Sequence, residues 1–165
     1  MIRMTRAITA PSVAKAAAVA PTVLNAMDHK DGWKKVMREY FEFYKQMPDH
    51  RLDKVFAKIQ SGEIESRVVV LNGEVIAATN FLPHAHTFSG SICYVNDLIV
   101  TPAARGNGVA TRLFAEISDY ARARGCGKVY WNTAPDNPAR KLYDQVGYVT
   151  PWLKYEINLA TLSKL

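Results

Sequence analysis

The sequence predicts a single α/β (α+β) domain over residues 1–165, and two of its patterns support this fold class. Segments with helical spacing of apolar residues alternate with short apolar runs that end at Gly, Asn or Pro, as expected where helices and strands alternate. With 48% hydrophobic and 22% charged residues, the 165-residue chain is long enough for one core and short for two. We identify no internal repeat, low-complexity tract or linker in it.

The composition limits the classes of partner. A formal net charge of +6 fits an anionic ligand, an acidic partner or a nucleic acid, and does not decide among them. Because the basic residues are scattered, with no run of five, we expect no nucleic-acid partner. Cys93 and Cys126 are too few for a secreted disulfide scaffold, so we expect reduced thiols and a cytoplasmic protein. No apolar window reaches the roughly eighteen residues of a membrane span, so we expect no membrane contact.

The first residues resemble an export signal only in part. Arg3 and Arg6 precede an apolar stretch, and a transit peptide remains an alternative. Pro11 and Lys15 interrupt that stretch, so we expect a strand over residues 2–5 and a helix after it.

Two further helices are predicted before the first hairpin. The segment "DGWKKVMREYFEFYKQM" places aromatic and aliphatic residues at helical spacing, and Pro48 follows its end. We interpret this stripe as core rather than as a ligand site; it consists of Trp33, Val36, Met37, Tyr40, Phe41 and Tyr44. The segment "RLDKVFAKIQSG" repeats the helical period, and Gly62 marks its stop.

Strands and one more helix follow. The segment "SRVVVLNGEVIAATNFL" predicts a hairpin, because Asn72 and Gly73 form the favoured two-residue turn between two apolar runs. The mostly apolar "SICYVNDLIV" is typical of a central strand, the fourth in our count, and Pro102 ends it. Helical spacing over 111–123 turns four side chains inward: Leu113, Phe114, Ile117 and Tyr120.

The loop "PAARGNGVA" between that strand and that helix is the strongest candidate for a ligand site. Glycines there allow backbone N–H groups to converge beside the positive end of a helix dipole, which suits a phosphate, and Arg105 adds charge. A tight turn without a ligand is the alternative. The loop fits neither a dinucleotide fingerprint, which needs a third small residue where Thr111 stands, nor a P-loop, which needs Lys where Val109 stands.

The spacing Arg-x-x-Gly-x-Ala in this loop resembles the acyl-coenzyme A signature of the GNAT superfamily of N-acetyltransferases. The segments "KVYWNT" and "NPARKLYDQVGY" extend the resemblance in the family's order over roughly residues 65–158. The chain looks most similar to small fungal and bacterial enzymes related to histone and polyamine acetyltransferases. The resemblance implies a GNAT fold, a mixed twisted sheet of about six or seven strands with helices on both faces and a splay between the fourth and fifth strands.

Similarity to the family also implies site residues. Acetyl-CoA would be the acyl donor, with its pantetheine arm on the edge of the fourth strand and its pyrophosphate on the loop. The implied cofactor-binding residues are Leu98, Ile99, Val100, Arg105, Gly106, Asn107, Gly108, Val109, Ala110 and Asn137. Asn137 stands six residues before Tyr143, where the family's asparagine usually stands seven before. Tyr143 matches the tyrosine that protonates the departing thiolate; packing on the sheet is its alternative role.

The resemblance is incomplete at the proton acceptor: the most similar family members have acid-acid-leucine in the fourth strand, where this chain has Asn96, Asp97 and Leu98. An alkylamine with a pKa near ~10 is mostly ammonium at neutral pH and must lose a proton before it attacks. Asp97 is the first candidate, His84 or His86 the next, and ordered water the last; a cap or ion pair is the alternative role for Asp97. The two histidines have no third ligand nearby, so we expect no metal.

The expected function is transfer of an acetyl group from acetyl-CoA to a primary amine, by direct attack in a ternary complex. The acceptor would be a polyamine, an amino acid or a lysine side chain, bound beside residues 31–60 and 83–89. The alternative is an acyl-CoA-binding regulator with little turnover. Relatives often pair through their last strands, so the resemblance admits a homodimer formed through "PWLKYEINL".

Overall fold

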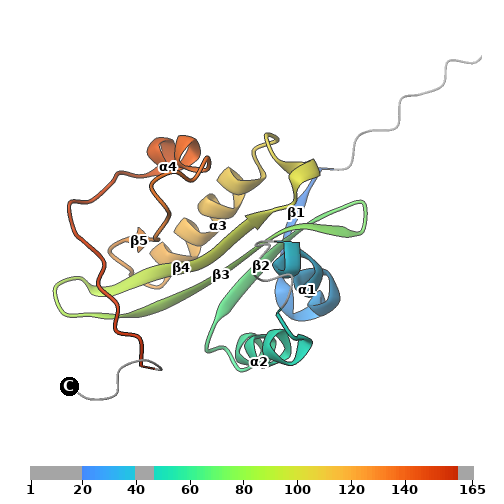
Figure 1. Ribbon diagram of the computed structural model, residues 1–165, viewed down its shortest axis with the longest axis horizontal. Helices are drawn as coiled ribbons and strands as arrows, with labels where there is room; N and C mark the ends of the chain where they lie inside the picture. Colours follow the sequence, from blue (N-terminus) through green and yellow to red (C-terminus); the bar gives the residue numbers. More distant parts are fainter. Residues whose placement is uncertain (1–19, 40–46, 160–165) are drawn as a thin grey trace, which may run out of the picture.

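The computed structural model describes residues 20–39 and 47–159, and these build one mixed sheet with helices on both faces (Figure 1). The strands lie in the order β1-β2-β3-β4-β5; neighbours are antiparallel except β4 and β5, which are parallel. Their bounds are Thr22–Asn25 for β1, Glu65–Leu71 for β2, Glu74–His86 for β3, Gly90–Val100 for β4 and Val129–Tyr130 for β5.

The expected six or seven strands are too many for the described part of the chain, whose sheet has five. The segment 151–159, expected to supply an edge strand, forms none there and is exposed along its whole length. β5, at that end of the sheet, is only two residues long. Conversely, β1 was not expected. The predicted strand over 2–5 and the helix after it lie outside the described residues.

The helices divide between the two faces of the sheet. One face carries α1 (Lys30–Glu39) and α2 (Asp49–Gln60), and the other carries α3 (Val109–Ala123) with the short α4 (Arg140–Val146) beside it (Figure 1). Separate buried clusters join each set to the strands, which confirms the predicted layering. In the described part of the chain, no helix is long and apolar enough to cross a membrane.

The cluster under α1 and α2 contains the first part of the predicted aromatic stripe. Trp33 and Val36 are fully buried, and the Trp33 ring meets Phe56 of α2 edge-on, with 5.4 Å between centroids. The interpretation of these residues as core is therefore confirmed, and Met37 packs against the same cluster. The other predicted members of the stripe lie outside the described residues: Tyr40, Phe41 and Tyr44.

Local turn chemistry follows the sequence closely. The β2–β3 turn has positive φ at both Asn72 (52°) and Gly73 (81°), as the predicted two-residue turn requires. The helix expected over 111–123 begins two residues earlier, at Val109. Gly108, its N-cap, has a φ of 71°, a conformation that glycine adopts without steric cost and that turns the chain directly into the helix.

One bulge in β4 changes which face its side chains reach. Asn80 of β3 pairs with Asp97 while the next residue, Phe81, pairs with Val95, so Asn96 is an extra residue in β4. Val95 therefore packs with the α3 cluster, and Asp97, two residues on, faces α1. Without the bulge, strict alternation would put both side chains on the same face.

Candidate functional site

The site lies where β4 and β5 separate. β5 pairs with β4 only at Cys93 and Tyr94, whereas β4 continues to Val100 with no neighbour on that side in the described structure. This gap is the splay predicted between the fourth and fifth strands. Leu98 and Val100 pack toward α3 and Ile99 toward α1, so side chains on both faces fix this stretch while its outer backbone edge stays open. An open edge can accept an extended amide-containing ligand as an added strand.

The glycine loop closes one end of this edge. After a 3-10 turn (Pro102–Ala104), Gly106 and Gly108 have φ of 78° and 71°, and space is open around both. Among the described residues, the N–H groups of Gly106, Asn107 and Gly108 have no hydrogen-bond acceptor. Val109 and Ala110 follow as the first turn of α3, where N–H groups have no partner within the helix.

Two side chains hold this loop in place. Arg105 donates through Nε to the carbonyl of Val100 at 3.1 Å, which anchors its guanidinium at the end of β4. The Asn107 side-chain amide donates to the carbonyls of Ala104 and Arg105 at 3.4 and 3.2 Å. Because these contacts leave the loop N–H groups without an acceptor at a helix N-terminus, the loop fits an anion such as a pyrophosphate.

A small pocket opens along the same edge and contains Tyr143 of α4. Its lining residues are Val95, Asn96, Leu98, Phe114, Trp131, Asn132 and Tyr143. The Tyr143 ring meets Trp131 and Phe114 edge-on, with centroids 5.5 and 5.9 Å apart. Burial raises the pKa of its phenol above the ordinary value of 10.0, so it keeps its proton at neutral pH. A neutral phenol beside an open strand edge can donate a proton to a leaving group.

Asn137, the remaining expected cofactor-binding residue, uses both ends of its side-chain amide within its own loop. Its Nδ2 donates to Thr133 Oγ1 and its Oδ1 accepts from the N–H of Ala139, each at 2.9 Å. These bonds shape the turn that leads into α4. In this structure Asn137 therefore supports the position of Tyr143 through the backbone.

Asp97 lies on the opposite side of the β4 edge from Tyr143. Its Oδ2 accepts from Asn80 Nδ2 at 2.9 Å, and burial raises the pKa of its carboxyl, against the effect of that hydrogen bond. The two expected catalytic groups are thus placed on either side of one open edge, the acid toward α4 and the carboxylate toward α1.

The histidines considered as alternatives lie farther along the sheet. His84 is within 2.9 Å of the Tyr130 hydroxyl through Nε2 and within 3.0 Å of the carbonyl of Ala85 through Nδ1. His86 accepts from the N–H of Ser89 at 3.2 Å. Within residues 20–39 and 47–159, no group of three or more His, Cys, Asp or Glu side chains is arranged to hold a metal ion.

Sequence reasoning missed several residues of this site. Phe114, which was expected to turn inward as core, lines the pocket, as do Val95 and Asn132, which had been given no role. Asn80 was not considered, because its contact with Asp97 depends on strand register and no local motif marks it.

Comparison with known proteins gives one consistent result. The model of the acetyltransferase (GNAT) family matches residues 31–148. The uncharacterized N-acetyltransferase YhfO of Bacillus subtilis is 34% identical over 130 residues, which cover 75% of this chain and 87% of that one. The D-amino-acid N-acetyltransferase HPA3 of Saccharomyces cerevisiae is 30% identical over 145 residues, covering 82% and 90%. The structure of AAC(6')-Iy with a CoA-containing bisubstrate analogue is 16% identical, with a TM-score of 0.75 and coverage of 85% and 99%.

Proposed function

The chain belongs to the GNAT family of acyl-CoA-dependent N-acetyltransferases, and on that premise we propose that it acetylates a primary amine by direct attack in a ternary complex. The observation that carries the proposal is the alignment of an anion-binding loop, an open strand edge and Tyr143 along one side of β4. The acceptor is a polyamine, an amino acid or a lysine side chain, and the similarity to a D-amino-acid N-acetyltransferase supports including amino acids of both hands.

Acetyl-CoA supplies the acetyl group as a thioester, and the chain provides a separate contact for each part of it. The N–H groups of Gly106, Asn107, Gly108, Val109 and Ala110 bind the pyrophosphate, and Arg105 adds charge at the rim. The outer edge of β4 at Leu98, Ile99 and Val100 pairs with the amide-containing arm. Asn137 contributes to the cofactor side through the turn it stabilises before α4.

Two side chains transfer protons in the proposed reaction. Asp97 takes one proton from the acceptor ammonium, the amine nitrogen bonds to the acetyl carbon, and the carbon–sulfur bond breaks. Tyr143 gives its proton to the leaving sulfur, and the second proton lost by nitrogen restores the phenol. The proton on Asp97 then passes to water, so each cycle releases one proton. Because Asp97 faces α1, the acceptor approaches from the side of α1 and α2.

Release of free CoA thiol tests this proposal. The panel holds amines, polyamines, amino acids of both hands and lysine peptides, assayed with the wild type, Tyr143→Phe and Tyr148→Phe. Tyr148 is 87% exposed and outside the pocket, so its variant controls for loss of a phenol. Turnover that falls at least tenfold in Tyr143→Phe alone supports the function and its acid. Tight acetyl-CoA binding without turnover on any acceptor favours the acyl-CoA-binding regulator instead.

We also propose that the protein is a cytoplasmic homodimer. The segment 151–159 supports the dimer, because exposed apolar residues alternate in it with the ion-paired Lys154 and Glu156, as on a half-buried strand. Its exposed members are Trp152, Leu153, Tyr155, Ile157 and Leu159. Free thiols at Cys93 and Cys126 fit a reducing compartment. Sedimentation of wild type and Tyr155→Lys tests the dimer, which predicts a monomer for the variant; a monomeric wild type contradicts it.

A further inference from the structure

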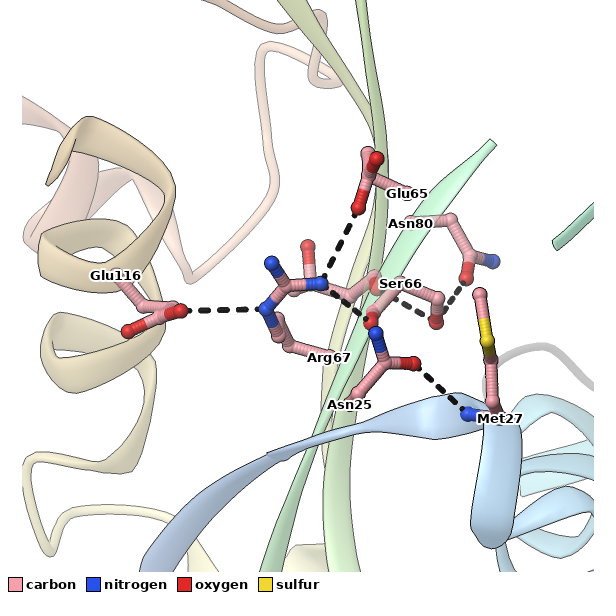
Figure 2. A network of polar contacts seen from close by, with 8 residues as sticks. Asn25, Met27, Glu65, Ser66, Arg67, Asn80 and Glu116 are labelled. Atoms are coloured by element: carbon pink, nitrogen blue, oxygen red, sulfur yellow. Dashed lines mark hydrogen bonds and ion pairs between the residues drawn. The ribbon is translucent and has the colours of Figure 1, made fainter. Parts of the chain in front are cut away.

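Asn80 of β3 is a buried amide that no step described above uses. It is 1% exposed, and its Oδ1 accepts from the indole Nε1 of Trp33 at 3.0 Å. The Ser66 hydroxyl of β2 lies 2.9 Å from the same oxygen and 3.1 Å from the carbonyl of Thr79. Figure 2 shows Ser66 turned toward Asn80, whereas its neighbour Arg67 extends the other way to Glu116 of α3. Three elements therefore meet at one side-chain amide.

These contacts fix which way the Asn80 amide points. An indole N–H can only donate, so the atom of Asn80 that faces Trp33 must be the oxygen. The amide nitrogen is then left on the other side, where it donates to Asp97 Oδ2 at 2.9 Å and lies 3.8 Å from the Met37 sulfur. A rotation that exchanged the two atoms would place two donors against each other in a buried site, which is costly. Asn80 can therefore donate to Asp97 but cannot accept from it.

We propose that Asn80, oriented by Trp33, is a positioning residue that holds Asp97 as a carboxylate aimed at the acceptor amine, ready to take its proton. This inference rests on the proposed transferase function. A protonated carboxyl needs an acceptor for its own hydrogen, and Asn80 offers only a donor to Oδ2. This hydrogen bond thus favours the charged form of Asp97, the one that serves as base, against the burial that favours the neutral form.

The surroundings of Asp97 oppose this hydrogen bond, and burial has the larger effect on the pKa of the carboxyl. Burial raises the pKa of the carboxyl, and the Asn80 donor is the influence that lowers it. The side chains that α1 and β3 place in this cluster do not ionise: Trp33, Met37, Thr79 and Asn80. The charged Lys34 of α1 turns instead to Asp49 and Asp53 of α2. Among the described residues, no charged side chain lowers the pKa of Asp97 as the Asn80 donor does.

The same register explains why the contact exists. The bulge at Asn96 brings Asp97 opposite Asn80 and onto the face of α1, where Trp33 is buried. Thr79, the neighbour of Asn80, donates through Oγ1 to the backbone carbonyl of Asp97 at 2.8 Å, so it touches the same residue without touching its carboxylate. Thr79 is therefore a matched control for Asn80.

The test is the pH profile of kcat/KM for wild type, Asn80→Leu and Thr79→Val. Loss of the donor raises the pKa of Asp97, so the acidic limb of Asn80→Leu moves up by about one pH unit. Activity on that limb then falls about tenfold, while the plateau at higher pH stays within about twofold. Thr79→Val keeps the wild-type limb. Trp33→Phe, which frees the amide to rotate, shifts the limb in the same direction by a smaller amount and substitutes if Asn80→Leu does not fold.

A titration of the Asp97 side-chain carboxyl by carbon-13 NMR gives a readout independent of turnover, with a higher pKa expected in Asn80→Leu than in wild type. An active wild type whose limb and carboxyl pKa do not move in Asn80→Leu or Trp33→Phe overturns this inference and leaves the transferase function standing. A wild type that binds acetyl-CoA but acetylates nothing overturns the proposed function, and the inference with it.

Discussion

Replacing Gly32 by alanine tests how closely α1 lies on β3. An alanine Cβ at position 32 would lie 2.4 Å from Val75 Cγ2 and 2.9 Å from Val75 Cβ. Ordinary carbon contacts are about 3.5–4.0 Å, so helix and strand must separate by about 1 Å. Overpacking of this kind costs about 1–3 kcal/mol, and alanine gains about 1 kcal/mol over glycine inside a helix. Because the contact is so short, we expect a net loss of about 1–2 kcal/mol in the free energy of unfolding.

Thermal and urea denaturation measure this loss, which corresponds to a fall in Tm of about 2–8 °C for a domain of this size. A Val75→Ala background removes the Cγ2 contact and leaves the Cβ contact at 2.9 Å. There, Gly32→Ala should cost less than about 1 kcal/mol, and the difference between the two backgrounds measures the contact itself. A Gly32→Ala protein that is about 1 kcal/mol more stable than wild type in both backgrounds would refute the close approach.

Three further predictions concern the site. Gly147→Ala places a Cβ 2.9 Å from Trp131 Cη2. This contact displaces the Trp131 ring that packs on Tyr143, so we expect kcat to fall about tenfold. In a Trp131→Phe background, which lacks this atom, kcat should recover partly. An alanine at position 108 would have to adopt a φ of 71°, which costs about 1–2 kcal/mol, so Gly108→Ala should weaken acetyl-CoA binding about tenfold, as measured by calorimetry. Gly62→Ala is the control: with a φ of 78°, it should lower the free energy of unfolding without weakening acetyl-CoA binding. Because burial raises the pKa of Tyr143, its acid form persists above pH 10.0, so an alkaline limb of kcat should lie above that pH and be absent in Tyr143→Phe.

The features predicted from sequence are those set by short-range chemistry. The turn at Asn72 and Gly73 and the loop at Gly106 and Gly108 need positive φ, which few residues adopt, so composition alone locates them. The helices are predicted because their buried faces repeat with the helical period over ten residues or more. The predicted helix boundaries are less accurate, as at Val109, where α3 begins two residues before the predicted start.

The features missed depend on contacts between distant segments. β1 is four residues long with little burial, and it exists because β2 lies beside it. The segment 151–159 has the alternation of a strand, but no strand among residues 20–39 and 47–159 pairs with it, so the pattern alone led to a wrong prediction. The pairing of Asn80 with Asp97 requires both the hairpin register and the bulge, neither of which a local pattern records.

The bulge at Asn96 has a consequence for how this strand tolerates insertions and deletions. The halves of β4 before and after it have opposite odd–even parity, each held by its own apolar cluster, through Val95 on one face and Ile99 on the other. Loss of the single Asn96 codon would remove the extra residue and leave Val95, Asp97 and Ile99 on the faces they now occupy, because Phe81–Val95 and Asn80–Asp97 are already consecutive pairs. The strand can thus lose this one residue without moving the Asp97 carboxylate, whereas loss of the Leu98 codon would bring Asn96 into the alternation and turn Asp97 to the face of α3.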